Sequence, residues 1–245
     1  MLRSVAAIGL ALMACESAPQ SRPETPEPDP VAAVSHPRAQ ADVAAQLQLA
    51  VSQGRLGDAH DLAAWFTTHE MTDHIGWRPY LDELRGAAQN IARANDLATA
   101  GVELGRLGHA CGGCHQAAGV TVAVDDTTPP EDTSTLVAQM RRQQWAAARL
   151  WEGLSGPADR AWSEGANVMV ATPFDIGSQM KDKPNVEAFE LAERLQDQAT
   201  HAVALRDLDA RANHYGELMQ TCAGCHRILR PLPVVNTGSP LVGSR

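Results

Sequence analysis

Aromatic residues are scarce in this chain of 245 residues, in which tryptophan, tyrosine and phenylalanine together make up 4%. After the N-terminal segment, no apolar stretch is long enough to cross a membrane, and no run of alternating β-branched residues indicates a sheet. The sequence also lacks a catalytic triad, a phosphate-binding loop and a motif of paired carboxylates. These absences argue against a β protein and against the common classes of enzyme.

Positive charge is also in short supply. The chain has 20 Lys and Arg against 29 Asp and Glu, which gives a formal net charge of −9. A surplus of negative charge repels phosphate backbones, so nucleic acid is not an expected partner. A protein partner with a basic or mixed-charge surface is expected instead.

The N-terminus predicts export. Residues 1–14 have the pattern of a signal peptide, with Arg3 before a short apolar run. The segment Leu12–Cys15 resembles a bacterial lipobox, so Cys15 is the expected lipidation site and would become the mature N-terminus. The alternative is an ordinary cleaved signal peptide with a chance cysteine. Because Ser17 rather than an acidic residue follows Glu16, sorting to the outer membrane is favoured over retention at the inner one.

The segment after Cys15 is rich in proline. Residues 15–37 contain six prolines with acidic residues between them. Proline at this density stiffens the chain into extended conformations. We expect a tether that holds a globular part away from a lipid surface, on the periplasmic side of a bacterial cell envelope.

Every cysteine has a place in a motif. Apart from Cys15, they form two Cys-x-x-Cys-His groups, at 111–115 and 222–226. In a haem c site two thiols bond to the vinyl groups of the porphyrin, and the histidine binds the iron. Positions i, i+3 and i+4 share one face of a helix, so all three side chains can reach one ring. The motifs predict two haem c groups, attached through Cys111, Cys114, Cys222 and Cys225, with His115 and His226 as iron ligands.

Zinc sites, redox dithiols and disulfides use the same cysteine spacing. A four-cysteine zinc site would have to unite both groups, and it would leave His115 and His226 without a role. A pair of disulfides would also leave the two histidines without a role. Two such groups in an exported chain therefore favour haem.

The chain carries a hidden duplication. A shift of 111 residues superposes both cysteine motifs and the residues before them, for example Gly105 on Gly216. A shift of 99 residues aligns an earlier segment, for example Gly54 with Gly153. The second copy is therefore expected to hold about twelve extra residues, at 172–184.

Apolar periodicity and glycine breaks predict four helices in each copy. The expected helices are 40–53, 58–68, 77–94 and 97–114, then 134–152, 157–170, 186–205 and 207–225. The predicted fold is all-α, with two tandem four-helix-bundle-like haem repeats at 38–118 and 133–230, each ending in a CxxCH helix. A linker at 119–132 and a C-terminal tail at 231–245 complete the expected organisation.

A haem motif at the end of the last of four helices resembles the class II cytochromes c, the cytochrome c′ family. In the commonest small cytochromes c, by contrast, the motif comes early and a later methionine binds the iron, whereas no Met or His follows His226 here. The resemblance implies that the first helix of each repeat faces the open side of the haem. Each repeat is shorter than is usual for that family.

The resemblance also suggests distal ligands. A methionine near the start of the first helix closes low-spin members of the family, and Met140 occupies that position in the second copy. Met140 is thus the candidate distal ligand of haem 2, and the alternative is a core methionine beside the ring. The 99-residue shift sets Ala41 opposite Met140, so the first copy lacks that ligand, and haem 1 is expected to be either open or bound by another residue. Other candidates are His36, His60, His69, Met71 and His74 for haem 1, and Met169 and Met180 for haem 2.

The expected function is single-electron transfer between redox partner proteins of the cell envelope, by a lipid-anchored dihaem carrier that is not an enzyme. One alternative is binding or sensing of nitric oxide or carbon monoxide at an open, five-coordinate haem 1. A dihaem peroxidase is a third possibility, against which the late position of both motifs argues. His109, His201 and His214 are expected to be exposed helix residues.

Overall fold

The computed structural model describes residues 38–69, 76–124, 126–132, 135–172 and 185–229. The predicted signal peptide, the lipidation site Cys15, the tether and the C-terminal tail lie outside the described residues. All but the first residue of the expected insertion at 172–184 lies outside them too.

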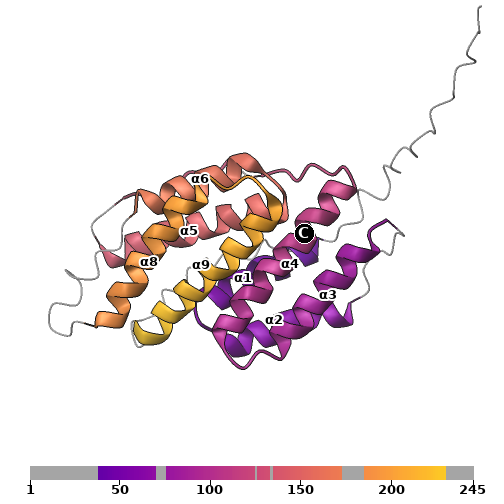
Figure 1. The fold of residues 1–245 in the computed structure, drawn as a ribbon, viewed down its shortest axis with the longest axis horizontal. Coiled ribbons are helices and arrows are strands. Elements are labelled where there is room, and N and C mark those ends of the chain that lie inside the picture. The colour runs from indigo at the N-terminus through magenta and orange to yellow at the C-terminus, as the bar shows by residue number, and fades with distance from the viewer. Residues whose placement is uncertain (1–37, 70–75, 125, 133–134, 173–184, 230–245) are drawn as a thin grey trace, which may run out of the picture.

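Every regular element of the described residues is a helix, which confirms the all-α prediction (Figure 1). Most predicted helix ends lie within three residues of the observed ones. The helices are α1 Arg38–Ser52, α2 Leu56–Thr68, α3 Arg78–Ala92, α4 Leu97–Ala117, α5 Leu136–Ser155, α6 Asp159–Val170, α8 Val186–Ala202 and α9 Leu208–Leu229.

Side chains that accept hydrogen bonds from backbone N–H groups set several helix starts. The carboxylate of Asp96 accepts from the Thr99 amide at 2.7 Å and begins α4. Thr135 and Asn185 cap α5 and α8 in the same way. These residues satisfy amides that lack a partner within the helix.

The first half of the chain, α1 to α4, and the second half, α5 to α9, follow the same helix order. The early helices correspond at an offset of 103 residues, since α1 ends at Ser52 and α5 at Ser155, and α2 begins at Leu56 and α6 at Asp159. Buried positions agree at this offset, for example Leu47 with Leu150. The 99-residue alignment was therefore wrong by about one helical turn, because glycines in helix ends matched out of register.

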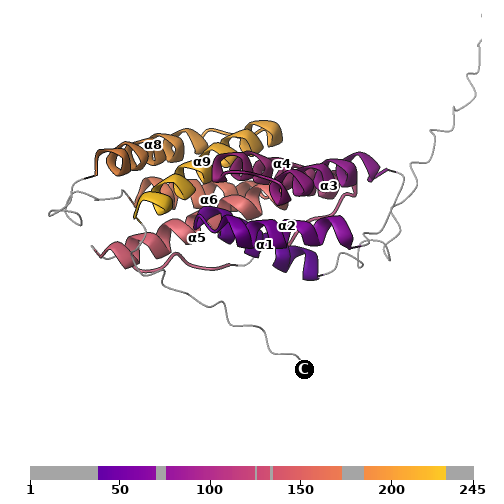
Figure 2. The same cartoon turned by 90° about the horizontal axis from the view of Figure 1, so that it is seen from below.

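The two halves interlock around α4 and α9, which cross as antiparallel neighbours (Figures 1 and 2). The backbones meet at Gly105 and Gly216, which are related by the 111-residue repeat, with Ala212 beside them. A Cβ atom on Gly105 would overlap the Ala212 carbonyl oxygen. Glycine is required here because the helices approach at backbone distance.

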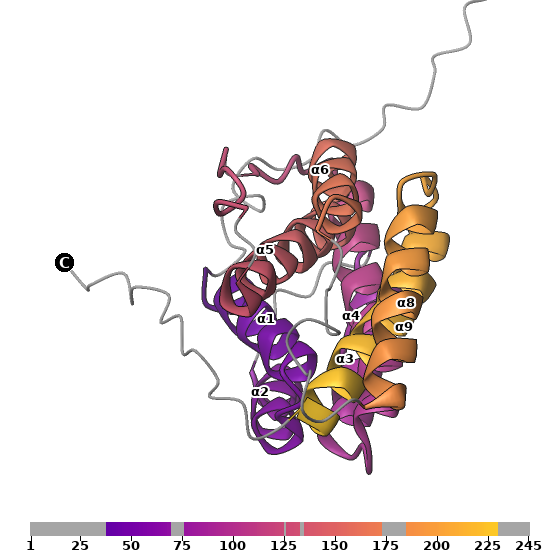
Figure 3. The same ribbon diagram turned by 90° about the vertical axis from the view of Figure 1, so that its left-hand side faces the viewer.

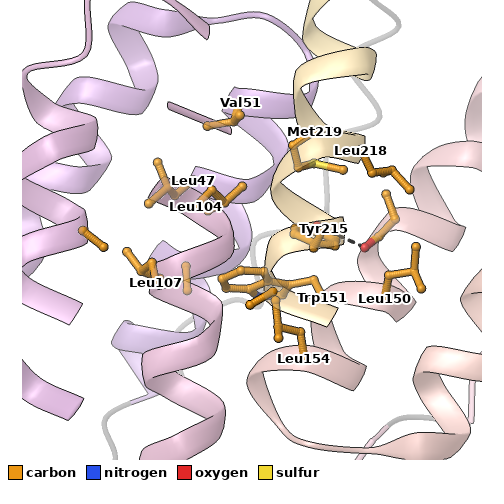
Figure 4. Packing of buried hydrophobic residues seen from close by; sticks show 14 of the residues in the cluster. Leu47, Val51, Leu104, Leu107, Leu150, Trp151, Leu154, Tyr215, Leu218 and Met219 are labelled. Atoms are coloured by element: carbon orange, nitrogen blue, oxygen red, sulfur yellow. Dashed lines mark hydrogen bonds between the residues drawn. The ribbon is translucent and has the colours of Figure 1, made fainter. Parts of the chain in front are cut away.

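One continuous apolar core joins both halves. The phenol of Tyr215 on α9 donates a hydrogen bond to the Ala147 carbonyl of α5 at 3.2 Å, and its ring lies 5.7 Å from that of Trp151 (Figure 4). Leu47 of α1 and Leu104 of α4 continue the core on the other side. The first helix of each half lies against the pair formed by α4 and α9 (Figure 3).

Two of the three histidines expected on the surface make internal contacts. His214 is buried, and its Nε2 atom donates to the Gln198 carbonyl at 2.8 Å, so that prediction was wrong. His109 lies 2.8 Å from both Glu83 of α3 and Asp209 of α9. Only His201 is exposed as expected. His214 is buried because α8 packs onto α9, a contact that the sequence of α9 alone does not reveal.

His214 is expected to make the fold sensitive to acid. Desolvation lowers its pKa below the ordinary value of 6.5, while its hydrogen bond to Gln198 opposes this shift. The unfolded chain therefore binds more protons as the pH falls below about 6.5, and stability falls by up to about 1.4 kcal/mol per pH unit for one such group. We expect thermal unfolding midpoints to fall less between pH 7 and pH 5 in His214→Gln than in the wild type. Equal pH dependence in the two proteins would reject this role.

Candidate haem-attachment sites

Each cysteine motif lies in the last turns of a long helix. Cys111, Cys114 and His115 belong to α4, which ends at Ala117. Cys222, Cys225 and His226 belong to α9, which ends at Leu229. Helical geometry puts the two thiols and the imidazole of each motif on one face.

The two motifs lie at opposite ends of the antiparallel pair. Gly112 of α4 contacts Leu208, at the first turn of α9. Cys222 lies 14 residues further along α9, about 21 Å away at 1.5 Å per residue. A zinc site or disulfide that joins the motifs is therefore excluded by geometry.

The environment of the thiols disfavours redox dithiol chemistry. Desolvation is the main cause that raises the pKa of Cys111 to about 12, with a smaller effect from Cys114. Desolvation, with a smaller effect from Cys225, raises the pKa of Cys222 to about 12, and desolvation raises the pKa of Cys225 to about 11. Reactive dithiols instead have lowered pKa values, typically at helix N-termini. Here the thiols lie at helix C-termini, where the helix dipole opposes a thiolate.

Both histidines hydrogen-bond to the backbone through Nδ1. The Nδ1 atom of His115 lies 2.7 Å from the Ser155 carbonyl oxygen, at the end of α5. The Nδ1 atom of His226 lies 2.5 Å from the Ser52 carbonyl oxygen, at the end of α1. A carbonyl oxygen can only accept, so each Nδ1 carries a proton, and in the neutral imidazole the lone pair is then on Nε2. Desolvation also lowers the pKa of His115, which favours the neutral imidazole that binds metals.

The small residues within the motifs serve helix packing. A Cβ on Gly113 would overlap the ring of Tyr80 on α3, and one on Gly112 would overlap the Leu154 carbonyl of α5. In α9, a Cβ on Gly224 would make only an ordinary contact with Leu191 of α8, at 3.5 Å. The two glycines of the first motif thus bring α3 and α5 close to α4.

Met140 lies on α5 at the level of the second motif. Helices α5 and α9 are antiparallel and meet at Ala147 and Tyr215. Met140 precedes Ala147 by seven residues and Cys222 follows Tyr215 by seven, so both lie about 10 Å from that contact in the same direction. Seven residues are two turns, so Met140 shares the face of α5 that carries Ala147. Its side chain is partly exposed.

The position in α1 that corresponds to Met140 falls on residue 37, outside the described residues. The described residues of α1 contain no Met, His or Cys. His60 bonds through Nε2 to the Ala94 carbonyl at 2.9 Å, near the start of α4, and so lies far from Cys111. His69 bonds to the Trp65 carbonyl and stacks on its ring. These contacts argue against both histidines as ligands of haem 1.

Met169 is the alternative candidate ligand of haem 2 that lies within the described residues. It is buried in the core at the end of α6. The remaining distal candidates, His36, Met71, His74 and Met180, lie outside the described residues.

The carbonyls of Ser52 and Ser155 were missed by sequence reasoning. Both residues end their helices, so their backbone oxygens have no acceptor role within the helix. Every residue has such a carbonyl, so no residue pattern marks these two. The only feature that marks these carbonyls is the end of a helix, and the predicted helix ends differ from the observed ones by up to three residues.

Within the described ranges no helix is long and apolar enough to span a membrane. No group of three or more His, Cys, Asp and Glu side chains in those ranges could hold a metal ion by itself. No family model, no curated protein and no solved structure matches the chain.

Proposed function

We propose that the protein is a dihaem c-type cytochrome that transfers single electrons between redox partner proteins, and that it is not an enzyme. The observation that carries the proposal is the pair of CxxCH motifs at two helix ends, each with its histidine bonded through Nδ1 to a backbone carbonyl. We further propose that its halves are two haem repeats similar to class II cytochromes c. A lipid anchor at Cys15 would hold it on the periplasmic side of a bacterial cell envelope, at the outer membrane.

The residues present fit haem better than other groups. Each motif offers two thiols and one imidazole on a single face, and it is remote from the other motif. Cys111 and Cys114 would add across the two vinyl groups of one haem, each S–H hydrogen passing to a vinyl carbon as the thioether C–S bond forms. Cys222 and Cys225 would do the same for the second haem. His115 and His226 would bind the irons through Nε2.

A bound haem supplies reversible one-electron chemistry at its iron. The chain's own part is to orient the imidazoles, to limit access of water and to set the potentials. The carbonyls of Ser52 and Ser155 hold the histidine rings in orientation. The buried side chain of Arg211 pairs with the exposed carboxylate of Asp159 at 2.6 Å and links α9 to α6. None of these roles needs a general acid or base.

The direct test is the absorption spectrum of protein matured with a cytochrome c assembly system, with haem quantified as its pyridine complex. Two covalent haems per chain and reversible one-electron reduction are expected. Protein without covalent haem, or with bound zinc in its place, would refute the proposal.

Binding of nitric oxide or carbon monoxide at haem 1 is the second candidate function. The residue opposite Met140 at the 103-residue offset is Pro37, which has no ligand atom in its side chain, and this favours an open haem 1. Carbon monoxide should then shift the spectrum of one haem in the reduced protein, whereas no shift would indicate two closed haems.

Substitution of Met140 tests the distal ligand of haem 2. Met140→Ala should convert haem 2 from a low-spin, carbon monoxide-insensitive form to an open one, because no thioether would remain on that face of α5. Met169→Ala is the matched control, since Met169 lies in the core of α6, and it should leave the spectrum unchanged. An unchanged spectrum in Met140→Ala would reject Met140 as a ligand.

A further inference from the structure

We propose that each half of the chain completes the haem site of the other: the carbonyl that ends α1 orients His226, and the carbonyl that ends α5 orients His115. This inference rests on the proposed function. It makes Ser52 and Ser155 positioning residues, which act through the histidines.

The two crossed contacts repeat each other. Ser52 and Ser155 correspond at the 103-residue offset of the early helices, and His115 and His226 correspond at the 111-residue offset of the motifs. The distances from Nδ1 to the carbonyl oxygen are 2.7 Å for His115 and 2.5 Å for His226. An accidental contact would not recur at both equivalent places.

Packing around each contact follows from the antiparallel crossing of α4 and α9. That crossing brings the end of α1 onto the last turns of α9. A Cβ on Gly54 would lie 3.5 Å from the Ala223 carbonyl and 3.7 Å from the His226 Cβ. At the opposite end of the α4–α9 pair, the Leu154 carbonyl of α5 lies so close to Gly112 of α4 that a Cβ there would overlap it. Each histidine is thus held by a helix end that comes from the other half.

The two histidine contacts should affect the reduction potentials of the haems. An Nδ1–H that donates to a carbonyl makes the imidazole a stronger electron donor, and it fixes the plane of the ring. A stronger donor favours ferric over ferrous iron and lowers the reduction potential. The end of α1 therefore tunes haem 2, and the end of α5 tunes haem 1. A structural change in one half is transmitted to the potential of the haem attached to the other.

Two matched proline substitutions test the crossing. A proline disfavours the helical conformation of the residue before it. Gln53→Pro should therefore turn the Ser52 carbonyl away from His226, and Gly156→Pro should turn the Ser155 carbonyl away from His115. Each variant also loses one backbone hydrogen bond, to the carbonyls of Leu49 and Glu152 respectively.

The potentials are measured by spectroelectrochemistry in the full chain with both haems bound. Chains with one pair of motif cysteines replaced by alanine identify which wave belongs to which haem. We expect Gln53→Pro to raise the potential of haem 2 alone, and Gly156→Pro to raise that of haem 1 alone. A shift confined to the haem of the same half, or no shift in a folded dihaem protein, would overturn the inference while leaving the proposed function intact. Wild-type protein without covalent haem would overturn both.

If Gln53→Pro does not fold, Gly54→Ala tests the contact between the end of α1 and His226. Gly54 has φ of +71°, so alanine there strains the turn that follows Ser52 without removing a hydrogen bond. It should raise the potential of haem 2. Gly119→Ala carries similar strain, at φ of +64°, in open space near the end of α4, and it should leave haem 2 unchanged. Equal effects of both variants on haem 2 would count against the crossing.

Discussion

Replacing Cys111 and Cys114 together with alanine should reduce the covalent haem content from two per chain to one. Both thioether bonds of haem 1 would be absent, and His115 alone would hold a haem only through its iron. Denaturation would then release that haem. The measurement is haem per chain after unfolding in acid or detergent, where only thioether-linked haem stays with the protein. The loss should be confined to haem 1, because Cys222 lies about 21 Å away towards the other end of α9, and Cys225 lies further along the same helix.

The chain offers matched controls for this experiment. Cys222→Ala with Cys225→Ala should remove the other haem and leave the first. Cys15→Ala removes a cysteine without removing a haem, and it should abolish lipid attachment alone. Two haems retained in the Cys111 and Cys114 double variant would show that haem 1 is assigned to the wrong residues. Zinc bound in proportion to the cysteines would indicate a separate zinc site at each motif.

Much of the fold could be predicted from the sequence because its signals are local. Asp96, Thr135 and Asn185 mark helix starts through their own side chains, and cysteine spacing within one helix is visible without any tertiary information. The two motifs and their helices were therefore identified directly.

Contacts between the halves could not be predicted, because they depend on the path of the backbone. The crossing at Gly105 and Gly216 appeared in the sequence only as a pair of repeated glycines. Its geometry decides that α1 reaches His226 and α5 reaches His115. The wrong 99-residue alignment has the same origin, since helix-end glycines mark breaks without fixing register. His214 was likewise predicted to be exposed, because its burial depends on the packing of α8 against α9.

Placing a methyl group at the crossing of α4 and α9 should severely destabilise the protein. In Gly105→Ala the new Cβ would overlap the Ala212 carbonyl oxygen and lie 3.1 Å from the Gly216 amide nitrogen. Both are backbone atoms, so no side chain can move aside and the helices must separate. We expect a loss of about 3 kcal/mol, the upper part of the range for overpacking, and a fall of roughly 6–12 °C in the unfolding midpoint.

Gly86→Ala is the matched control for that experiment. Gly86 lies in the middle of α3, and a Cβ there would meet nothing within 4 Å. Alanine should therefore stabilise the protein by about 0.5–1 kcal/mol, through helix propensity alone. The contrast isolates the crossing from the general effect of a Gly→Ala change in a helix. Because α4 and α9 join the two halves, Gly105→Ala should also loosen both crossed histidine contacts at once. Equal stability in the two variants would mean that the helices do not meet at backbone distance.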